Sequence, residues 1–184
     1  MIQLPFRRPA RDPTIAALYG MIVAQARSPY FYRGYGVPDT VDGRFDMIVL
    51  HLVLFLRRLK SEPSAAQSLG QEVFNLFCRD IDDNFREMGM GDLAVPREMR
   101  KVGEAFYGRA AAYEAALALE DASLAEALGR NIFGEPSDGA RRLAAYMREA
   151  VRQLGTQGNF SSAEVRFPDP EKIAPAPLEE SLRA

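Results

Sequence analysis

His51 is the only histidine in the 184-residue chain, and it lies in an otherwise apolar run that extends from Met47 to Leu56. A histidine in this setting can serve as a haem or metal ligand, or as a general base. No second metal-binding side chain stands one helical turn further on, because Leu54 and Phe55 occupy those positions. We therefore expect a neutral, buried histidine with satisfied hydrogen bonds. The alternative is a helical module that binds haem or another hydrophobic molecule through His51.

Residues 79–87, RDIDDNFRE, form the densest charged cluster of the chain. Asp80, Asp83 and Glu87 follow at positions i, i+3 and i+7, so they share one face of a helix, and three carboxylates can bind Mg²⁺. Arg86 interrupts the run of aspartates, and the chain has no second aspartate-rich motif. We expect an ion-paired helix face here, and a magnesium-dependent helical enzyme is the second alternative.

The segment around residues 28–38 combines aromatic side chains with arginine, a composition that protein-interaction hot spots favour. We expect a turn-rich loop that either packs onto the domain or presents a binding surface. A second candidate surface consists of basic residues that could meet acidic or phosphate groups. The candidate contacts are Arg27, Tyr30, Phe31, Tyr32, Arg33 and Tyr35 in the loop, and Arg44, Arg86, Lys101 and Arg109 in the second surface.

The elements that carry these residues are predicted to be helices. The apolar run belongs to a helix over 39–60, with Asp39, Thr40 or Asp42 as its N-cap. It is too short to span a membrane, which takes about 20 apolar residues, so we expect a buried central helix. Apolar periodicity predicts further helices over 13–27, from Ser61 or Ser64 to Met88, and over 96–117, 121–129 and 137–154, the last capped by Ser137. The fold class is therefore all-α, a single domain of about six helices.

The ends of the chain differ from this domain. Residues 1–12 contain Pro5 and Pro9 and are predicted to be an extended arm, with Asp12 capping the first helix. The helical domain covers 13–155. Residues 156–184 are rich in proline and show little periodicity, so we expect an extended or disordered tail.

Composition argues against several classes of function. The net charge of −2 implies no broad basic surface, so direct nucleic-acid binding is not expected. Cys78 is the only cysteine, which excludes an intrachain disulfide and a cysteine-based zinc site. No signal peptide is visible, so we expect a cytoplasmic protein, with peripheral contact to the inner membrane left open.

The chain resembles the ubiquinol–cytochrome c chaperone family from about Ile15 to Leu154. The resemblance is carried by the entry to the central helix, by His51, and by the acidic run before residue 90. The helix start Pro96–Lys101 and the segment Phe106–Arg109 add to the resemblance. The matching positions are Asp39, Thr40, Gly43, Arg44, Phe45, His51, Asp82, Asp83, Arg86, Glu87, Met88 and Gly89.

The resemblance implies a non-catalytic assembly chaperone for ubiquinol–cytochrome c reductase (respiratory complex III), with no cofactor. It implies binding of newly made cytochrome b or of complex III intermediates, and for mitochondrial members contact with the ribosome and a small partner protein. On this basis we expect the aromatic loop to contact the client, with the basic surface as the second contact.

Overall fold

The computed structural model describes residues 12–158, 160 and 163–173. Within these residues every regular element is a helix, which confirms the all-α prediction. Most of the predicted N-terminal arm (1–11) and the end of the predicted tail (174–184) lie outside the described residues. The helices are α1 (Pro13–Ala26), α2 (Pro29–Arg33), α3 (Val41–Leu59), α4 (Ser64–Glu87), α5 (Val95–Leu117), α6 (Asp121–Leu128) and α7 (Asp138–Gly155), with a π-helical turn η1 (Gly129–Phe133) and a 3₁₀ turn η2 (Pro170–Lys172).

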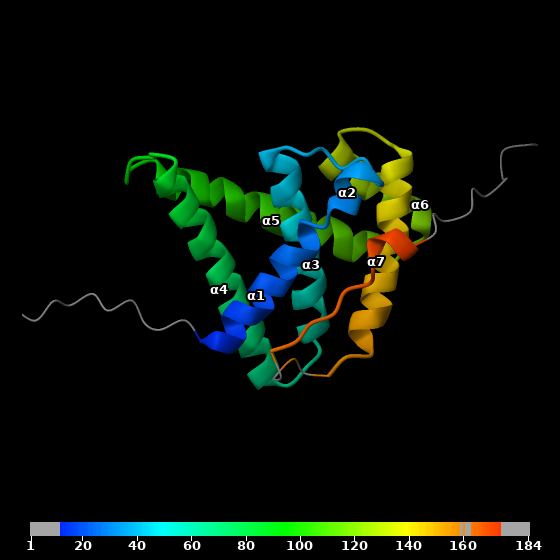
Figure 1. Cartoon of the computed structure of the whole chain (residues 1–184), viewed down its shortest axis with the longest axis horizontal. Helices are drawn as coiled ribbons and strands as arrows, with labels where there is room; N and C mark the ends of the chain where they lie inside the picture. Colours follow the sequence, from blue (N-terminus) through cyan, green and yellow to red (C-terminus); the bar gives the residue numbers. More distant parts are fainter. Residues whose placement is uncertain (1–11, 159, 161–162, 174–184) are drawn as a thin grey trace, which may run out of the picture.

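The apolar helix α3 is the centre of the fold, as predicted. All residues from Met47 to Phe55 are buried. Thr40 caps the helix, because its Oγ1 accepts a hydrogen bond from the Gly43 amide at 3.1 Å. Figure 1 shows α3 in the middle of the molecule, with α1 and α4 on one side and α7 on the other.

Helices α4 and α5 form a long hairpin that opens away from the rest of the domain. Gly89 follows the end of α4 with a φ of 84°, the left-handed conformation that glycine adopts most readily. Figure 1 shows α4 rising to one corner and α5 returning from that corner across the molecule. The predicted caps Ser61 and Ser64 are wrong, because Pro63 holds the N-cap position of α4 without a side-chain bond.

The aromatic segment is not the irregular loop that its turn residues predicted. Residues 29–33 form the short helix α2, which begins with Pro29 directly after Ser28. Proline fits the first position of a helix because its missing N–H would have no partner there and its φ is already helical. Phe31 points from this turn into the core, where its burial stabilises the helix.

The last helix begins as predicted, since the Ser137 Oγ accepts a hydrogen bond from the Ala140 amide at 3.1 Å. The connection expected over 131–136 is partly helical, because α6 continues directly into η1. None of the helices in the described part of the chain is long and apolar enough to cross a membrane.

Residues 163–173, the longest described part of the predicted tail, are extended up to the turn η2 and lie against the domain (Figure 1). Its backbone carbonyls accept hydrogen bonds from side chains of the helical core. Gln25 Nε2 donates to the Pro168 carbonyl at 3.0 Å, and the Tyr35 hydroxyl donates to the Pro170 carbonyl at 2.8 Å. Val165, Pro168 and Pro170 are buried in this position, so the segment adds to the core.

Candidate functional site

Two of the predicted client contacts belong to the core. Phe31 is 0% exposed and Tyr35 3% exposed. The Phe31 ring lies edge-on against Tyr146, His51 and Tyr35, with centroid separations of 4.9, 5.4 and 5.5 Å. In this conformation Phe31 and Tyr35 cannot contact a partner, so that expectation is corrected for these two residues. The apolar rings gain more from burial than from forming an exposed patch.

The outer side of the same segment stays accessible. Arg27 and Arg33 are exposed, and Tyr30 and Tyr32 are partly exposed. Tyr32 is held in place because its hydroxyl donates to the Ala26 carbonyl at 2.9 Å. A surface of four residues therefore remains from the six that the sequence suggested.

His51 is fully buried, and both of its ring nitrogens have partners. Nδ1 lies 2.7 Å from the Met47 carbonyl, and Nε2 lies 2.8 Å from the Tyr146 hydroxyl. Burial lowers the pKa of His51 to about 4, so the ring is neutral at pH 7. A haem iron would need one of these nitrogens, and its ligation would require breaking a buried hydrogen bond.

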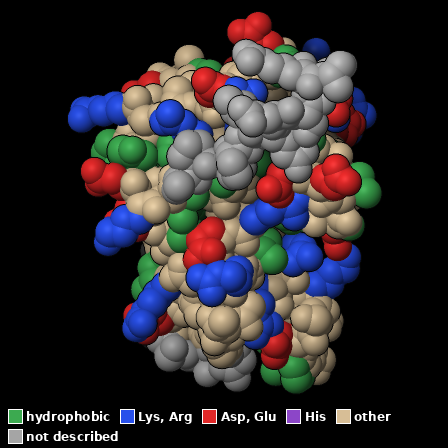
Figure 2. Space-filling view, turned by 90° about the vertical axis from the view of Figure 1, so that its right-hand side faces the viewer, with side chains coloured by type: hydrophobic (Ala, Val, Ile, Leu, Met, Phe, Trp, Pro, Cys, Tyr) green, Lys and Arg blue, Asp and Glu red, His purple; other side chains and the backbone are tan. Residues whose placement is uncertain are grey.

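The four basic residues of the second predicted surface are all paired with acidic side chains. Arg44 pairs with Asp39 at 2.7 Å, Lys101 pairs with Glu98 at 2.9 Å, and Arg86 pairs with both Asp82 and Asp92. Each cation is therefore neutralised by its own neighbour. Figure 2 shows the same mixture on the face of α6 and α7, where basic and acidic side chains alternate.

Arg109, the fourth of these residues, is largely buried between α3 and α5. Its Nη2 lies 2.7 Å from Asp46 Oδ1, and its guanidinium carbon lies 5.9 Å from the centroid of the Phe45 ring. Phe45 in turn stacks on Phe77. Burial raises the pKa of Asp46 to about 6 and outweighs the opposing effect of Arg109. These residues join α3, α4 and α5.

The acidic face of α4 is partly engaged in structural contacts. Asp80 Oδ2 accepts a hydrogen bond from the Tyr19 hydroxyl at 2.9 Å. Asp80, Asp83 and Glu87 lie on α4 as predicted. No group of three or more histidine, cysteine, aspartate or glutamate side chains within residues 12–158, 160 and 163–173 is arranged to hold a metal ion.

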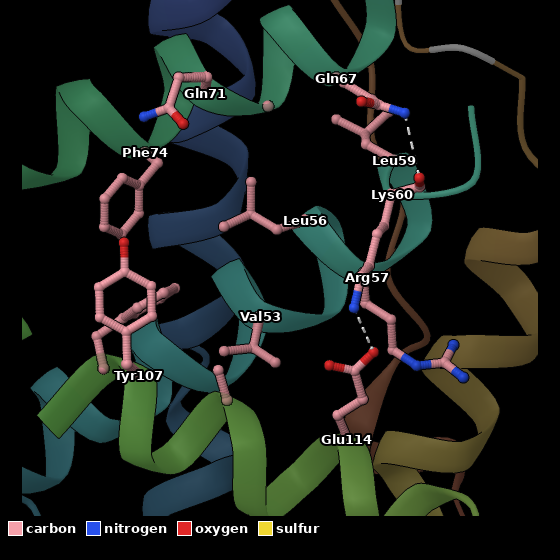
Figure 3. Close-up of a pocket in the computed structure, with 13 residues that line it drawn as sticks. Val53, Leu56, Arg57, Leu59, Lys60, Gln67, Gln71, Phe74, Tyr107 and Glu114 are labelled. Carbon is pink, nitrogen blue, oxygen red and sulfur yellow. Dashed lines mark hydrogen bonds and ion pairs between the residues drawn. The ribbon is translucent and has the colours of Figure 1, made fainter. Parts of the chain in front are cut away.

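A groove of about 520 Å³ lies where α3, α4 and α5 meet, and sequence reasoning did not identify it. Figure 3 shows Val53 and Leu56 from α3 at its centre, with the tilted rings of Phe74 and Tyr107 at one end and Lys60 and Glu114 joined across the other. Tyr107 is 64% exposed. The lining residues are Val53, Leu56, Arg57, Leu59, Lys60, Gln67, Gly70, Gln71, Phe74, Phe106, Tyr107, Ala110 and Glu114.

Grooves of this form, apolar with a polar rim between helices, accept amphipathic helices in other proteins. The model of the ubiquinol-cytochrome c chaperone family matches residues 33–166. The chain therefore belongs to this family, which confirms the resemblance found in the sequence.

Solved and curated relatives agree with this assignment. The crystal structure of the Cbp3 homolog from Brucella abortus superposes with a TM-score of 0.80 at 36% identity and covers 89% of this chain and 93% of that one. Ubiquinol-cytochrome-c reductase complex assembly factor 1 of Xenopus laevis is 29% identical over 77% of this chain and 74% of its own length. The Mus musculus and Homo sapiens proteins of that name are each 26% identical, over 83% and 76% of this chain, and the match covers only 55% and 48% of their lengths.

Proposed function

We propose that this protein is a non-catalytic assembly chaperone that binds newly made cytochrome b before it is incorporated into complex III. Membership of the chaperone family supports the assembly role. The single observation that carries the binding role is the open groove between α3, α4 and α5, with Leu56, Phe74 and Tyr107 accessible inside a polar rim.

The groove suits a client of this kind. A newly made membrane protein exposes long apolar segments that must be kept from aggregating before they are built into a complex. A chaperone for it needs accessible apolar surface in a confined area. The polar rim of Gln67, Gln71 and Lys60 keeps the area of exposed apolar surface small.

We place this activity at the cytoplasmic face of the inner membrane, where the protein would be a peripheral partner of the client. The exposed side of the aromatic segment, Arg27, Tyr30, Tyr32 and Arg33, is proposed as a second contact. Its arginine and tyrosine composition fits a protein surface, either the client itself, the ribosome or a small partner protein.

The test is affinity purification of the tagged protein from native membranes in mild detergent, followed by quantitative mass spectrometry. We expect cytochrome b to be enriched without the mature iron–sulfur subunit. Tyr107→Ser should reduce this enrichment, and Leu119→Ser should not, because Leu119 is 61% exposed but does not line the groove. Absence of every complex III subunit, while cytochrome b is being made, would contradict the proposal.

A further inference from the structure

The shape of the groove indicates what it can hold. Each of its three walls is one face of a helix and extends over about two turns, or roughly 10 Å. Residues 53, 56, 57 and 59 line it from α3, with Lys60 directly after this helix. Residues 67, 70, 71 and 74 line it from α4, and residues 106, 107, 110 and 114 from α5. The groove is therefore short, and its walls repeat at helical spacing.

The floor of the groove is closed where α4 crosses α3. Gly70 permits this crossing, because a Cβ atom at this position would lie 3.1 Å from Leu59 Cδ1 and 3.2 Å from Leu56 Cδ2. Because the two helices touch at Gly70, an occupant would rest on Leu56 and approach from the solvent side.

An extended segment would find few hydrogen-bond partners here. The walls are helices, whose backbone groups are already paired within each helix. The rim amides are also engaged, since Gln67 Nε2 donates to the Lys60 and Glu62 carbonyls and Gln71 Nε2 donates to Asn75. The extended segment 163–173 of this chain, by contrast, lies where Gln25 and Tyr35 donate to its carbonyls. A helix satisfies its own backbone, so it suits the groove better.

The two ends of the groove differ in charge, and this difference sets the orientation of a bound segment. At one end Lys60 Nζ pairs with Glu114 Oε1 at 2.9 Å, and both side chains are more than half exposed. The Arg57 side chain stands beside this pair (Figure 3) and forms no hydrogen bond or ion pair with any residue of the described part of the chain. This end therefore carries two cations and one anion, whereas the other end, at Phe74 and Tyr107, is uncharged.

We propose that the groove binds an amphipathic helix of the client, whose apolar face covers Leu56, Phe74 and Tyr107. An aspartate or glutamate on that helix lies beside its apolar face and pairs with Arg57 and Lys60. This inference rests on the proposed function for the client's identity and adds to it the conformation, direction and charge of the bound segment.

The test uses the full-length chain in its native cells, with a photo-crosslinking amino acid in place of Gln71, which is exposed on the rim. We expect crosslinks that map to one amphipathic, acid-bearing segment of the partner. Arg57→Glu should reduce the crosslink yield by about tenfold, the effect of reversing one partner of an interface ion pair. When the mapped acidic residue of the partner is replaced by arginine, the crosslink yield of the Arg57→Glu variant should be restored.

The matched control is Arg97→Glu, which makes the same charge change at an exposed position of α5 outside the groove. Unfolding midpoints of both variants show whether the fold is intact. Crosslinks to a segment without an acidic residue, to an extended loop, to lipid or to a second copy of this chain would overturn the inference. So would an unchanged yield with Arg57→Glu.

The two proposals can fail separately. If cytochrome b co-purifies but crosslinks only from positions such as Tyr32, the proposed function stands and the groove assignment is overturned. If an acid-bearing helix of a different protein crosslinks at Gln71 and shows the charge-swap rescue, the groove binds a helix of the proposed kind and the cytochrome b assignment is contradicted.

Discussion

The hydroxyl of Tyr146 donates a hydrogen bond to Nε2 of His51 across 2.8 Å, joining α7 to α3 inside the core. The direction of this bond follows from the other side of the ring, because the Met47 carbonyl can only accept and therefore requires the proton on Nδ1. The Tyr146 oxygen in turn accepts from Gln25 Nε2 at 3.0 Å. The three side chains form a fully paired polar chain that fixes one tautomer of His51.

The neutral state of His51 predicts a specific loss of stability in acid. The pKa of His51 is about 4 in the folded protein and about 6.5 in the unfolded chain, so between these values the unfolded state binds more protons. The contribution of His51 to the free energy of unfolding should therefore fall by about 1.4 kcal/mol per pH unit as the pH drops through this window.

Urea denaturation at several pH values checks this prediction against His51→Gln, which cannot titrate. The stability advantage of the wild type over the variant should shrink by about 3 kcal/mol from pH 7 to pH 4. Asp46 titrates in the same range with the opposite sign, but it is present in both proteins and cancels in the difference. A constant difference would contradict the assignment of a neutral, buried ring.

Phe31 and Tyr32 are neighbours that differ in burial, so their alanine variants should differ in stability. Phe31→Ala removes a fully buried ring and should cost about 3–5 kcal/mol of unfolding free energy. Tyr32→Ala removes a half-exposed ring with one hydrogen bond and should cost about 1 kcal/mol. Thermal and urea unfolding measure both values. Equal losses would show that the two side chains are buried alike.

Arg109 and Arg86 both form ion pairs, but only the first pair is buried. Arg109→Met leaves the Asp46 carboxyl in the core without its cation and should cost about 3 kcal/mol at pH 7.5. Arg86→Met breaks exposed pairs and should cost less than about 1 kcal/mol. The Arg109 loss should be smaller at pH 5, because Asp46 is then protonated in both proteins. A loss independent of pH would contradict the role of the charge.

Gly43 and Gly108 offer a second matched pair. A Cβ atom at Gly43 would lie 2.0 Å from the Pro38 carbonyl oxygen, so Gly43→Ala must displace the start of α3 and should destabilise the protein strongly. A Cβ atom at Gly108 meets nothing within 4 Å, and Gly108→Ala should stabilise α5 by about 0.5–1 kcal/mol. Melting temperatures that change in the same direction would contradict this contrast.

Much of the fold followed from patterns along the chain. The uninterrupted apolar run identified α3 as the central helix. Thr40 was one of three candidates for the N-cap of α3 and Ser137 was the predicted cap of the last helix, and the structure confirms both caps. These features are local, so neighbouring residues contain the information. The short helix α2 was missed because its stability comes from Phe31 packing against Tyr146, far away in the sequence.

The candidate site could not be predicted in the same way. Val53 and Leu56 belong to a run that is apolar throughout, and sequence alone does not show that one strip of it lies open to the groove. That strip depends on the angle at which α4 and α5 diverge, which Gly70 and the contacts of Arg109 help to set. The aromatic segment attracted attention by composition, but composition could not separate the buried Phe31 from the accessible Tyr32.

The extended segment 163–173 has a consequence for how the protein is synthesised. Tyr35 and the Pro170 carbonyl that it binds are 135 positions apart, so this contact forms only after α1 to α7 have been translated. Until then, the core beside Phe31 and His51 lacks the cover of Phe167, whose ring centroid lies 5.0 Å from that of His51. A nascent chain whose residues 163–173 have not yet left the ribosome therefore lacks part of the cover of its core, and the domain gains these contacts only after that segment has emerged.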